Sequence, residues 1–339
     1  MSRLSRAEVQ LQNRAKVLAA ARAEFAEHGY RDGKVDRIAD RANLTRGAVY
    51  SNFPGKRALY LTALTELADT SPAASQPRRE RGGTDGLSAF ASAWLSRRDL
   101  GFDVLPEVSE LPYAELLGLN AVLLGLSLDR LAPGHLGTKI QAARLAISLL
   151  HGASQLGASA PGFVQPLAVA RACSELADLE LDDPWMPPPS TPPVRPADGL
   201  WAPPAVLDAV ERRTAEFQAD GVVVVLGLNR LAAAEDAVRS TDGAVTVALV
   251  SSDPAELGPL ARYTVGSLLG CLRQSMPLPR TQVVHDEAGV LASAVGCEVI
   301  GDDLEYAVRL AGGRIVAWAE GFGAAAAIAR VRTSDHLML

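Results

Sequence analysis

The chain has 339 residues, 48% of them hydrophobic, and a formal net charge of −6. This length suffices for two or three domains with buried cores. No apolar run reaches the roughly twenty residues that a membrane span requires, and the N-terminus is charged. We therefore expect a cytoplasmic protein with neither a signal peptide nor a membrane partner.

The first predicted helix begins near residue 11 and ends at Gly29. Apolar residues recur three or four positions apart on one face of it: Leu11, Ala15, Leu18, Ala21 and Phe25. Gly29 is expected to end the helix, because a residue without Cβ adopts the left-handed cap conformation at no steric cost.

A second and a third helix follow around a tight turn. The apolar stripe of the second helix comprises Val35, Ile38, Ala39 and Ala42. Asn43 is placed at the corner, since Asn tolerates a left-handed backbone. Thr45 offers a hydroxyl N-cap for the third helix, which carries Arg46, Gly47, Val49, Tyr50 and Phe53. Two helices joined in this way form a helix-turn-helix that fits the major groove of DNA.

The charge distribution also indicates a DNA-binding N-terminus. Residues 1–66 contain 12 Lys and Arg against 7 Asp and Glu, whereas the remainder contains 21 against 32. A basic domain on an acidic body is attracted to phosphate at one end only. Lys56 and Arg57 follow Pro54-Gly55 in the first turn of a fourth helix, where two cations and unpaired N–H groups predict a phosphate site.

This region resembles the TetR/AcrR family of bacterial transcriptional regulators. The resemblance rests on a Gly-aromatic pair, an Ile-Ala-x-x-Ala helix and a Tyr-x-x-Phe-x-x-Lys close, here Gly29-Tyr30, Ile38-Ala39 with Ala42, and Tyr50, Phe53 and Lys56. Two positions depart from the family: Asn43 replaces the usual turn glycine, and Gly33-Lys34 replaces the hydroxylated residue that opens the second helix. Gly33 therefore loses a side-chain cap, and the second helix is expected to be shorter.

The resemblance implies a homodimer that binds double-stranded operator DNA and responds to a small-molecule effector. The candidate DNA-binding residues are Thr45, Arg46, Gly47, Tyr50, Asn52 and Lys56. Arg46 is expected to contact base edges, with an ordinary solvated arginine as the alternative. The resemblance implies a phosphate contact for Tyr50, with a packed aromatic as the alternative.

Residues 67–183 are predicted to be an all-helical effector-binding and dimerisation domain. A Pro/Gly/Arg-rich break at 71–86 is expected to be a loop, and helices are expected over 87–98, 113–131, 136–156 and 164–179. Candidate ligand-pocket residues are Phe90, Trp94, Phe102 and Tyr113, which would otherwise be simple core. The last two helices are the expected dimer pair, through Ile140, Arg144, Ile147, Leu150 and His151 on one and Leu167, Ala170, Cys173 and Leu176 on the other.

Residues 184–204 contain nine prolines in twenty-one positions. Such a stretch is expected to run as a semi-rigid polyproline linker. Because few contacts would cross it, the remainder of the chain is expected to fold independently.

Residues 205–335 are predicted to form an α/β domain. Strands are expected at 222–228, 245–250, 281–285, 304–310 and 314–318, and helices at 231–239, 254–272, 288–295 and 322–331. This order resembles thioredoxin-like domains, the peroxiredoxin branch most, through HDEAGVLASAVG at 285–296 and LEYAVRLAGGRIVAWAEG at 304–321. The predicted fold class is thus multidomain: an all-α helix-turn-helix and regulatory part, then an α/β thioredoxin-like domain.

The thiol chemistry of the peroxiredoxin branch is not expected in this chain. A redoxin requires a thiolate at the start of the helix after the first strand, where this chain has Gly227-Leu228-Asn229-Arg230. Cys271 and Cys297 are expected to be buried, and neither the cysteines nor the five histidines have metal-ligand spacing. We therefore expect no catalytic residue, no metal and no cofactor. The predicted function is that of a ligand-responsive repressor. Two alternatives remain: a redox sensor that uses Cys271 or Cys297, and a DNA-bound scaffold whose C-terminal domain recruits a protein.

Overall fold

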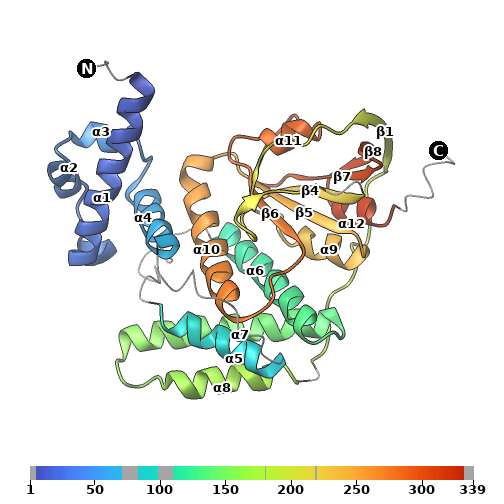
Figure 1. Ribbon diagram of the computed structural model, residues 1–339, viewed down its shortest axis with the longest axis horizontal. Helices are drawn as coiled ribbons and strands as arrows, with labels where there is room; N and C mark the ends of the chain where they lie inside the picture. The colour runs from blue at the N-terminus through green and yellow to red at the C-terminus, as the bar shows by residue number, and fades with distance from the viewer. Residues whose placement is uncertain (1–4, 71–82, 98–109, 180, 218–219, 332–339) are drawn as a thin grey trace.

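The computed structural model describes residues 5–70, 83–97, 110–179, 181–217 and 220–331. The N-terminal half of the chain is helical (Figure 1). Its helices are α1 (Arg6–Asp32), α2 (Val35–Ala42), α3 (Arg46–Tyr50), α4 (Lys56–Thr70), α5 (Gly83–Leu95), α6 (Glu110–Leu131), α7 (Leu136–Ser159) and α8 (Pro166–Leu176). Helix α5 begins at Gly83, four residues before the expected start, and most of the expected loop at 71–86 lies outside the described residues.

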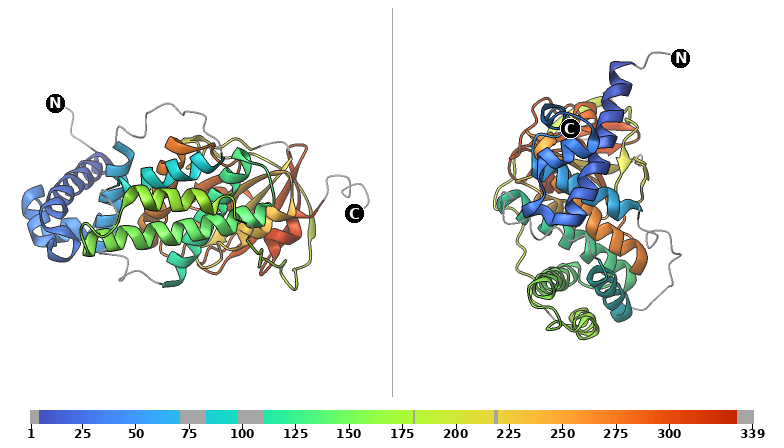
Figure 2. Two further views of the ribbon diagram at one scale, coloured as in Figure 1. Left: turned by 90° about the horizontal axis from the view of Figure 1, so that it is seen from below. Right: turned by 90° about the vertical axis from the view of Figure 1, so that its left-hand side faces the viewer.

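Helices α1–α3 form a small domain at one end of the molecule, and α4 leads from it to the body (Figures 1 and 2). In the body, α6 packs against α7, and α5 packs against α8. The segment Leu111–Leu131 of α6 is long and apolar enough to cross a membrane, but 61% of its most apolar window is buried inside the protein. Its apolar side chains therefore have protein neighbours.

The C-terminal half contains a six-stranded mixed sheet with the order β1-β8-β7-β4-β5-β6. The strands are β1 (Arg195–Leu200), β4 (Gly221–Gly227), β5 (Ala244–Val250), β6 (Gln282–His285), β7 (Glu305–Ala311) and β8 (Arg314–Glu320), with β2 (Leu207–Asp208) and β3 (Arg213–Thr214) as a separate pair. Strands β4, β5 and β6 are parallel, whereas β7 runs antiparallel to both β4 and β8. The helices are α9 (Ala233–Ser240), α10 (Pro254–Ser275), α11 (Val290–Ala294) and α12 (Ala324–Ala329).

Strand β4 is central because both of its faces are covered. All seven of its residues are buried, and successive side chains of a strand point to opposite faces. Val222, Val224 and Leu226 belong to the core that includes α9, α10 and α12. Val223 and Val225 belong to a smaller core with α11. The continuous apolar run in the sequence therefore predicts this strand correctly.

The proline-rich segment 184–204 is more than a linker. Arg195–Leu200 forms strand β1, which pairs antiparallel with β8 and lies at the edge of the sheet. An edge strand tolerates Pro196, because one side of its backbone needs no ladder hydrogen bond. The expected polyproline spacer is thus wrong for this part of the segment.

The expectation of an independent C-terminal domain is also wrong. Helix α10 packs against α4, α5 and α6 (Figure 1), and one continuous hydrophobic core includes residues of both halves. The reason is that α10 is apolar on more than one face: Leu260, Val265 and Leu272 are all almost completely buried. Prolines in the connecting segment do not limit what a later helix packs against.

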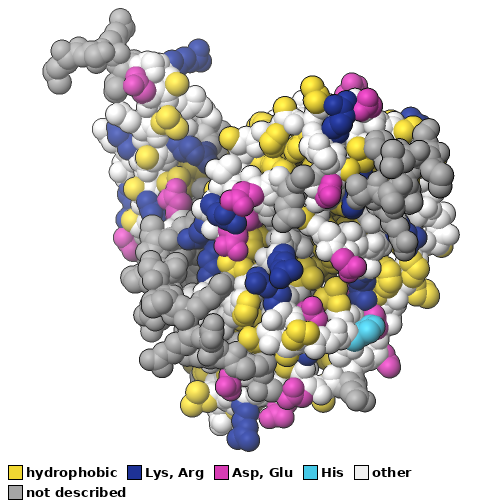
Figure 3. Space-filling view, turned by 45° about the vertical axis from the view of Figure 1, so that its right-hand side comes forward, with side chains coloured by type: hydrophobic (Ala, Val, Ile, Leu, Met, Phe, Trp, Pro, Cys, Tyr) yellow, Lys and Arg dark blue, Asp and Glu magenta, His cyan; other side chains and the backbone are white. Residues whose placement is uncertain are grey.

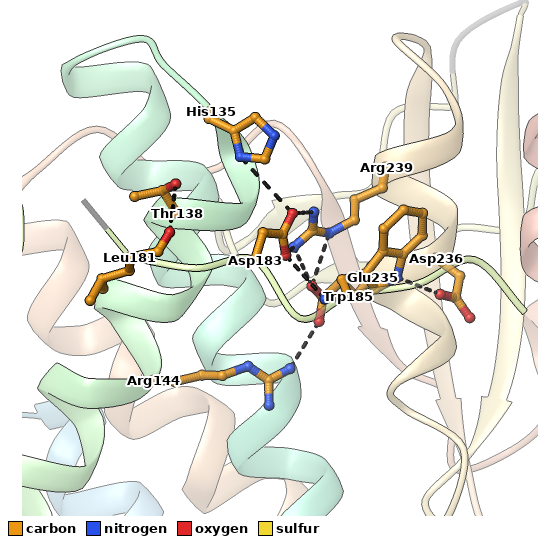
Figure 4. Close-up of polar contacts among 9 residues, drawn as sticks. All are labelled: His135, Thr138, Arg144, Leu181, Asp183, Trp185, Glu235, Asp236 and Arg239. Atoms are coloured by element: carbon orange, nitrogen blue, oxygen red, sulfur yellow. Dashed lines mark hydrogen bonds and ion pairs between the residues drawn. The ribbon is translucent and has the colours of Figure 1, made fainter. Parts of the chain in front are cut away.

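A polar network ties α9 to the helical body (Figure 4). The Arg239 guanidinium donates to Asp183 at 2.7 and 3.1 Å and to Glu235 at 2.7 and 2.9 Å. Arg144 of α7 donates to the other oxygen of Glu235 at 2.9 Å. Trp185 donates from its indole nitrogen to an oxygen of Asp236 at 2.9 Å. Asp183 and Trp185 belong to the segment after α8, so this segment is held between α7 and α9.

Candidate DNA-binding surface

The turn between α2 and α3 has the predicted geometry. Asn43 is left-handed, with φ 54° and ψ 46°, and it caps α2. Thr45 is extended, and its hydroxyl accepts the Ala48 N–H at 3.2 Å, which caps α3. Both sequence-based predictions are confirmed. Val49 is buried within α3 and Phe53 is buried three residues after its end, so the opposite face of α3 points outward.

The exposed face of α3 carries most of the candidate contact residues. Thr45, Arg46, Gly47 and Tyr50 are all exposed. The Arg46 guanidinium lies 3.2 Å from Asp36 and 5.6 Å from the centre of the Tyr50 ring. A hydrogen bond with Tyr50 and the charge of Asp36 raise the pKa of Arg46. Arg46 is thus a solvent-exposed cation at the start of α3, and its position is restrained by Asp36 and Tyr50.

The other two candidate residues, Asn52 and Lys56, have structural partners. The Asn52 amide nitrogen donates to the carbonyl oxygen of Ala48 at 2.8 Å. The Lys56 ammonium donates to the carbonyl oxygen of Arg31 at 3.1 Å and lies 4.6 Å from the centre of the Tyr30 ring. Lys56 therefore stabilises the end of α1 in addition to lying at the start of α4.

Arg57, the second predicted phosphate ligand, is paired with the C-terminal half. Its guanidinium contacts Glu256 of α10 at 2.5 and 2.8 Å, and both side chains are about three-quarters buried. Nothing local in the sequence predicts this pair, because 199 residues separate the partners. In Figure 3, basic side chains are spread over the N-terminal domain, and acidic and basic groups lie side by side where it meets the body.

The central buried group of the small domain is Glu24, which the sequence analysis missed. It is 0% exposed and accepts hydrogen bonds from the Lys34 backbone at 3.0 Å and from Arg37 at 2.5 Å. Its other oxygen forms an ion pair with Arg41 at 3.4 Å. Burial raises the pKa of Glu24, but the hydrogen bonds from Lys34 and Arg37 outweigh this and leave the pKa below its ordinary value. Glu24 thus supplies, from α1, the cap that Gly33 and Lys34 lack. An acidic residue beside Phe25 on an apolar face was the available signal.

Three of the four candidate pocket residues lie in the body, and Phe102 lies outside the described residues. Phe90 and Trp94 are buried, with ring centres 6.2 Å apart, and the Trp94 ring lies 4.9 Å from that of His151. The Tyr113 hydroxyl is 3.3 Å from Nε2 of His151. Burial, and then the neighbouring Tyr263, raise the pKa of Tyr113. The structure therefore brings Trp94, Tyr113 and His151 together across α5, α6 and α7.

At the junction after β4, where a redoxin would hold its thiolate, the residues contact other parts of the chain. The backbone leaves no room beside Gly227, where an added Cβ would stand 2.2 Å from the carbonyl oxygen of Asp302. Arg230 is paired at 2.7 Å with Glu305, whose side chain is 1% exposed. Cys271 and Cys297 are buried thiols, and burial raises the pKa of Cys297, with a further contribution from Glu320. Among the described residues no group of three His, Cys, Asp or Glu side chains could hold a metal ion.

Comparison with known proteins agrees with the geometry of the small domain. Residues 17–63 match the family model of bacterial regulatory proteins of the tetR family. Over 60 residues the chain is 40% identical to the "Probable acrEF/envCD operon repressor" of Escherichia coli K12, and equally to that of Escherichia coli O157:H7. This stretch is 18% of the chain and 27% of the relative, so the chain spans about a quarter of the length of these curated relatives.

The chain is also similar to solved structures, two of which match about half of its length. One comes from work on the control of antibiotic production by a bacterial hormone, with 23% identity, a TM-score of 0.34, and coverage of 48% of this chain and 94% of that one. The other is of a transcriptional regulator from Streptomyces coelicolor, with 22% identity, a TM-score of 0.30, and coverage of 49% and 96%. At these TM-scores the structural likeness adds nothing to the assignment. The family model and the helix-turn-helix geometry together identify residues 17–63 as an N-terminal DNA-binding domain of the tetR family of bacterial regulatory proteins.

Proposed function

We propose that the protein is a cytoplasmic, ligand-responsive transcriptional repressor that binds palindromic operator DNA as a homodimer. The observation that carries the proposal is the outward face of α3, where Arg46 and Tyr50 are exposed behind a capped, left-handed turn. In such a domain the second helix of the motif enters the major groove, and a dimer reads two half-sites about one helical turn apart. In this proposal residues 1–66 bind DNA, residues 67–183 bind the effector and form the dimer, and residues 205–335 are the α/β part.

An exposed apolar surface on α7 and α8 supports the dimer. Leu145, Leu149 and Leu156 lie on one face of α7 and are 44%, 37% and 47% exposed, and Leu167 at the start of α8 is 85% exposed. A two-fold interface is self-complementary, so such a face meets its own copy. These residues differ from most of those expected from sequence, because Ile140, Ile147, Leu150, Ala170 and Cys173 are buried within the protomer.

The cluster of Trp94, Tyr113 and His151 is the proposed effector site. It combines two large aromatic rings with a half-buried imidazole, and the indole nitrogen of Trp94 is buried without a hydrogen-bond partner among the described residues. A buried donor without a partner is costly, and a bound molecule with an acceptor would satisfy it. An effector acts by favouring one of two conformers with different spacing of the recognition helices.

The α/β half is proposed to be thioredoxin-like. Support comes from the element order β4-α9-β5-α10-β6-α11-β7-β8-α12, which is the order on which the resemblance rests. Its β4–α9 junction, whose residues contact other parts of the chain, and its buried thiols favour a regulatory role over a redox one.

The test is selection of bound duplexes from a random-sequence pool by the purified full chain, followed by a footprint upstream of its own gene. We expect one enriched palindrome with half-sites about one helical turn apart. Leu149→Glu is expected to give monomers in sedimentation and to lose this DNA. The control, Gln155→Glu, adds the same charge outside the apolar face. Enrichment of no sequence, or a wild-type monomer at micromolar concentration, would contradict the proposal.

A further inference from the structure

The carboxylate of Glu256 lies at the N-terminus of α4. One of its oxygens accepts a hydrogen bond from Nε of Arg57 at 2.8 Å and forms an ion pair with a terminal nitrogen of the same guanidinium at 2.5 Å. On its other side it lies against Gly55, where a Cβ would stand 3.4 Å from one carboxylate oxygen. The first turn of a helix has N–H groups without intrahelical acceptors and attracts anions. An anion from the C-terminal half therefore occupies this helix end.

The sequence predicts a DNA phosphate at the same place. Of the two cations expected to bind it, Lys56 donates to the backbone of Arg31, so Arg57 is the one whose charge the Glu256 carboxylate neutralises. Carboxylate and phosphate oxygens satisfy the same guanidinium donors with similar geometry. They cannot both occupy the turn formed by Gly55 and Arg57.

We propose that Glu256 is an internal competitor of a DNA phosphate at the start of α4, so that the C-terminal half weakens DNA binding until the carboxylate is displaced. The inference rests on the proposed DNA-binding function and adds an autoinhibitory contact to it. The TetR-type domain alone does not contain this contact, because Glu256 belongs to α10.

The construction of α10 permits a local displacement. Glu256 lies in the first turn, and Pro259 follows within the helix. Proline has no N–H, so the carbonyl of Ala255 lacks its usual donor and the first turn is tied less firmly to the second. Beyond this point α10 is anchored by Leu260, Val265 and Leu268, which are at most 2% exposed. Glu256 therefore lies in the part of α10 that precedes the proline, whereas the rest of the helix is anchored in the core.

The test compares the full chain with Glu256→Gln in binding to a fluorescent duplex of mixed sequence, since phosphate contacts do not depend on sequence. We expect Glu256→Gln to bind about fivefold tighter at roughly 100 mM salt, the size of one partly exposed ion pair. The slope of log K against log salt should steepen by about one, because Arg57 then releases a counterion from the duplex. In the Arg57→Gln background, Glu256→Gln should produce neither change.

Glu287→Gln is the matched control, because Glu287 forms its ion pair with Arg262 of α10 rather than with Arg57. Should Glu256→Gln lower the melting temperature, Glu256→Asp, which withdraws the carboxylate by one methylene, is expected to show the same tightening. Unchanged or weaker binding by both variants, with the wild type binding, would overturn the inference alone and make Glu256 a positioning residue. Absence of duplex binding by every chain, the wild type included, would overturn the proposed function as well.

Discussion

The recognition helix keeps the motif of a functional family, whereas the β4–α9 junction lacks the thiol that a redoxin would need there, and the two sites also differ in what surrounds their polar residues. At α3, Arg46 and Tyr50 are exposed on a helix whose other face is buried. At the junction, Gly227 lies against the Asp302 backbone and Arg230 is paired with the buried Glu305. The first site can meet a ligand as large as DNA. At the second, the polar residues are paired with groups of their own chain.

A family motif therefore predicts function only where its polar side chains remain accessible to a ligand. A cysteine placed at Gly227 would not restore redox chemistry, since its Cβ would collide with backbone. In accessibility, Arg57 is intermediate between the exposed residues of α3 and the paired residues of the β4–α9 junction. It is in the DNA-binding domain, yet it is held by Glu256 of the C-terminal half.

The largest effect is expected where the two halves meet. Arg239→Ala leaves Asp183 and the nearly buried Glu235 without their main counter-charge. Breaking a buried pair on one side costs about 3–5 kcal/mol, and urea unfolding of the full chain measures it. Arg213→Ala is the control, because its pair with Glu216 is exposed and should cost under about 1 kcal/mol. Equal losses in the two variants would mean that the halves are only loosely attached.

The next effect concerns the small domain alone. Glu24→Gln removes the charge that accepts from Lys34 and Arg37, at a cost of about 1.5–3 kcal/mol at pH 7. Because the folded pKa of Glu24 is depressed, its contribution is complete above the ordinary value of about 4.3 and is lost as the pH falls through the folded value. The difference between wild type and variant, measured by thermal melts, should therefore shrink below about pH 4. A difference that is constant from pH 7 to pH 3 would contradict this.

At the recognition helix the effect falls on DNA rather than on stability. Arg46→Ala should weaken operator binding by about tenfold to a hundredfold and relax preference at one base position. Arg46→Lys keeps the charge but loses the bidentate geometry, and should therefore retain affinity for mixed-sequence duplex while losing that preference. Equal binding of operator by all three proteins would remove Arg46 from the recognition surface.

No effect is expected at the thiols. With buried sulfurs and a raised pKa at Cys297, too little thiolate is exposed to reduce peroxide. The full chain and its Cys271→Ser/Cys297→Ser variant should both leave peroxide unconsumed. Turnover by the wild type that the double variant lacks would make the junction comparison wrong and favour the redox-sensing alternative.

Local structure was predictable from the sequence because it depends on neighbouring residues. Asn43 and Thr45 determine the turn of the motif, and the run at Val222–Val225 determines the central strand. The end of a helix was less predictable. Leu11 continues the apolar spacing of α1 but is 68% exposed.

Long-range packing was not predictable in the same way. Ile147 and Leu149 lie two residues apart on α7, and nothing in their chemistry tells which one faces the core. The partner of Arg57 could not be predicted either, because a charged side chain does not indicate which oppositely charged residue, here 199 positions away, it will contact. The contact of Lys56 with the carbonyl oxygen of Arg31 spans 25 residues and is hidden from the sequence for the same reason.

The shared core around α10 has a consequence for synthesis of the chain. The helices that α10 covers belong to a segment that ends at Leu176, yet α10 is complete only at Ser275, roughly a hundred residues later. At about 5–20 residues per second, the ribosome delivers it about 5–20 s after the body has emerged. During that interval the faces of α4, α5 and α6 that α10 covers in the complete protein lack this helix. A nascent chain that ends at the proline-rich segment therefore exposes apolar surface that the complete chain buries.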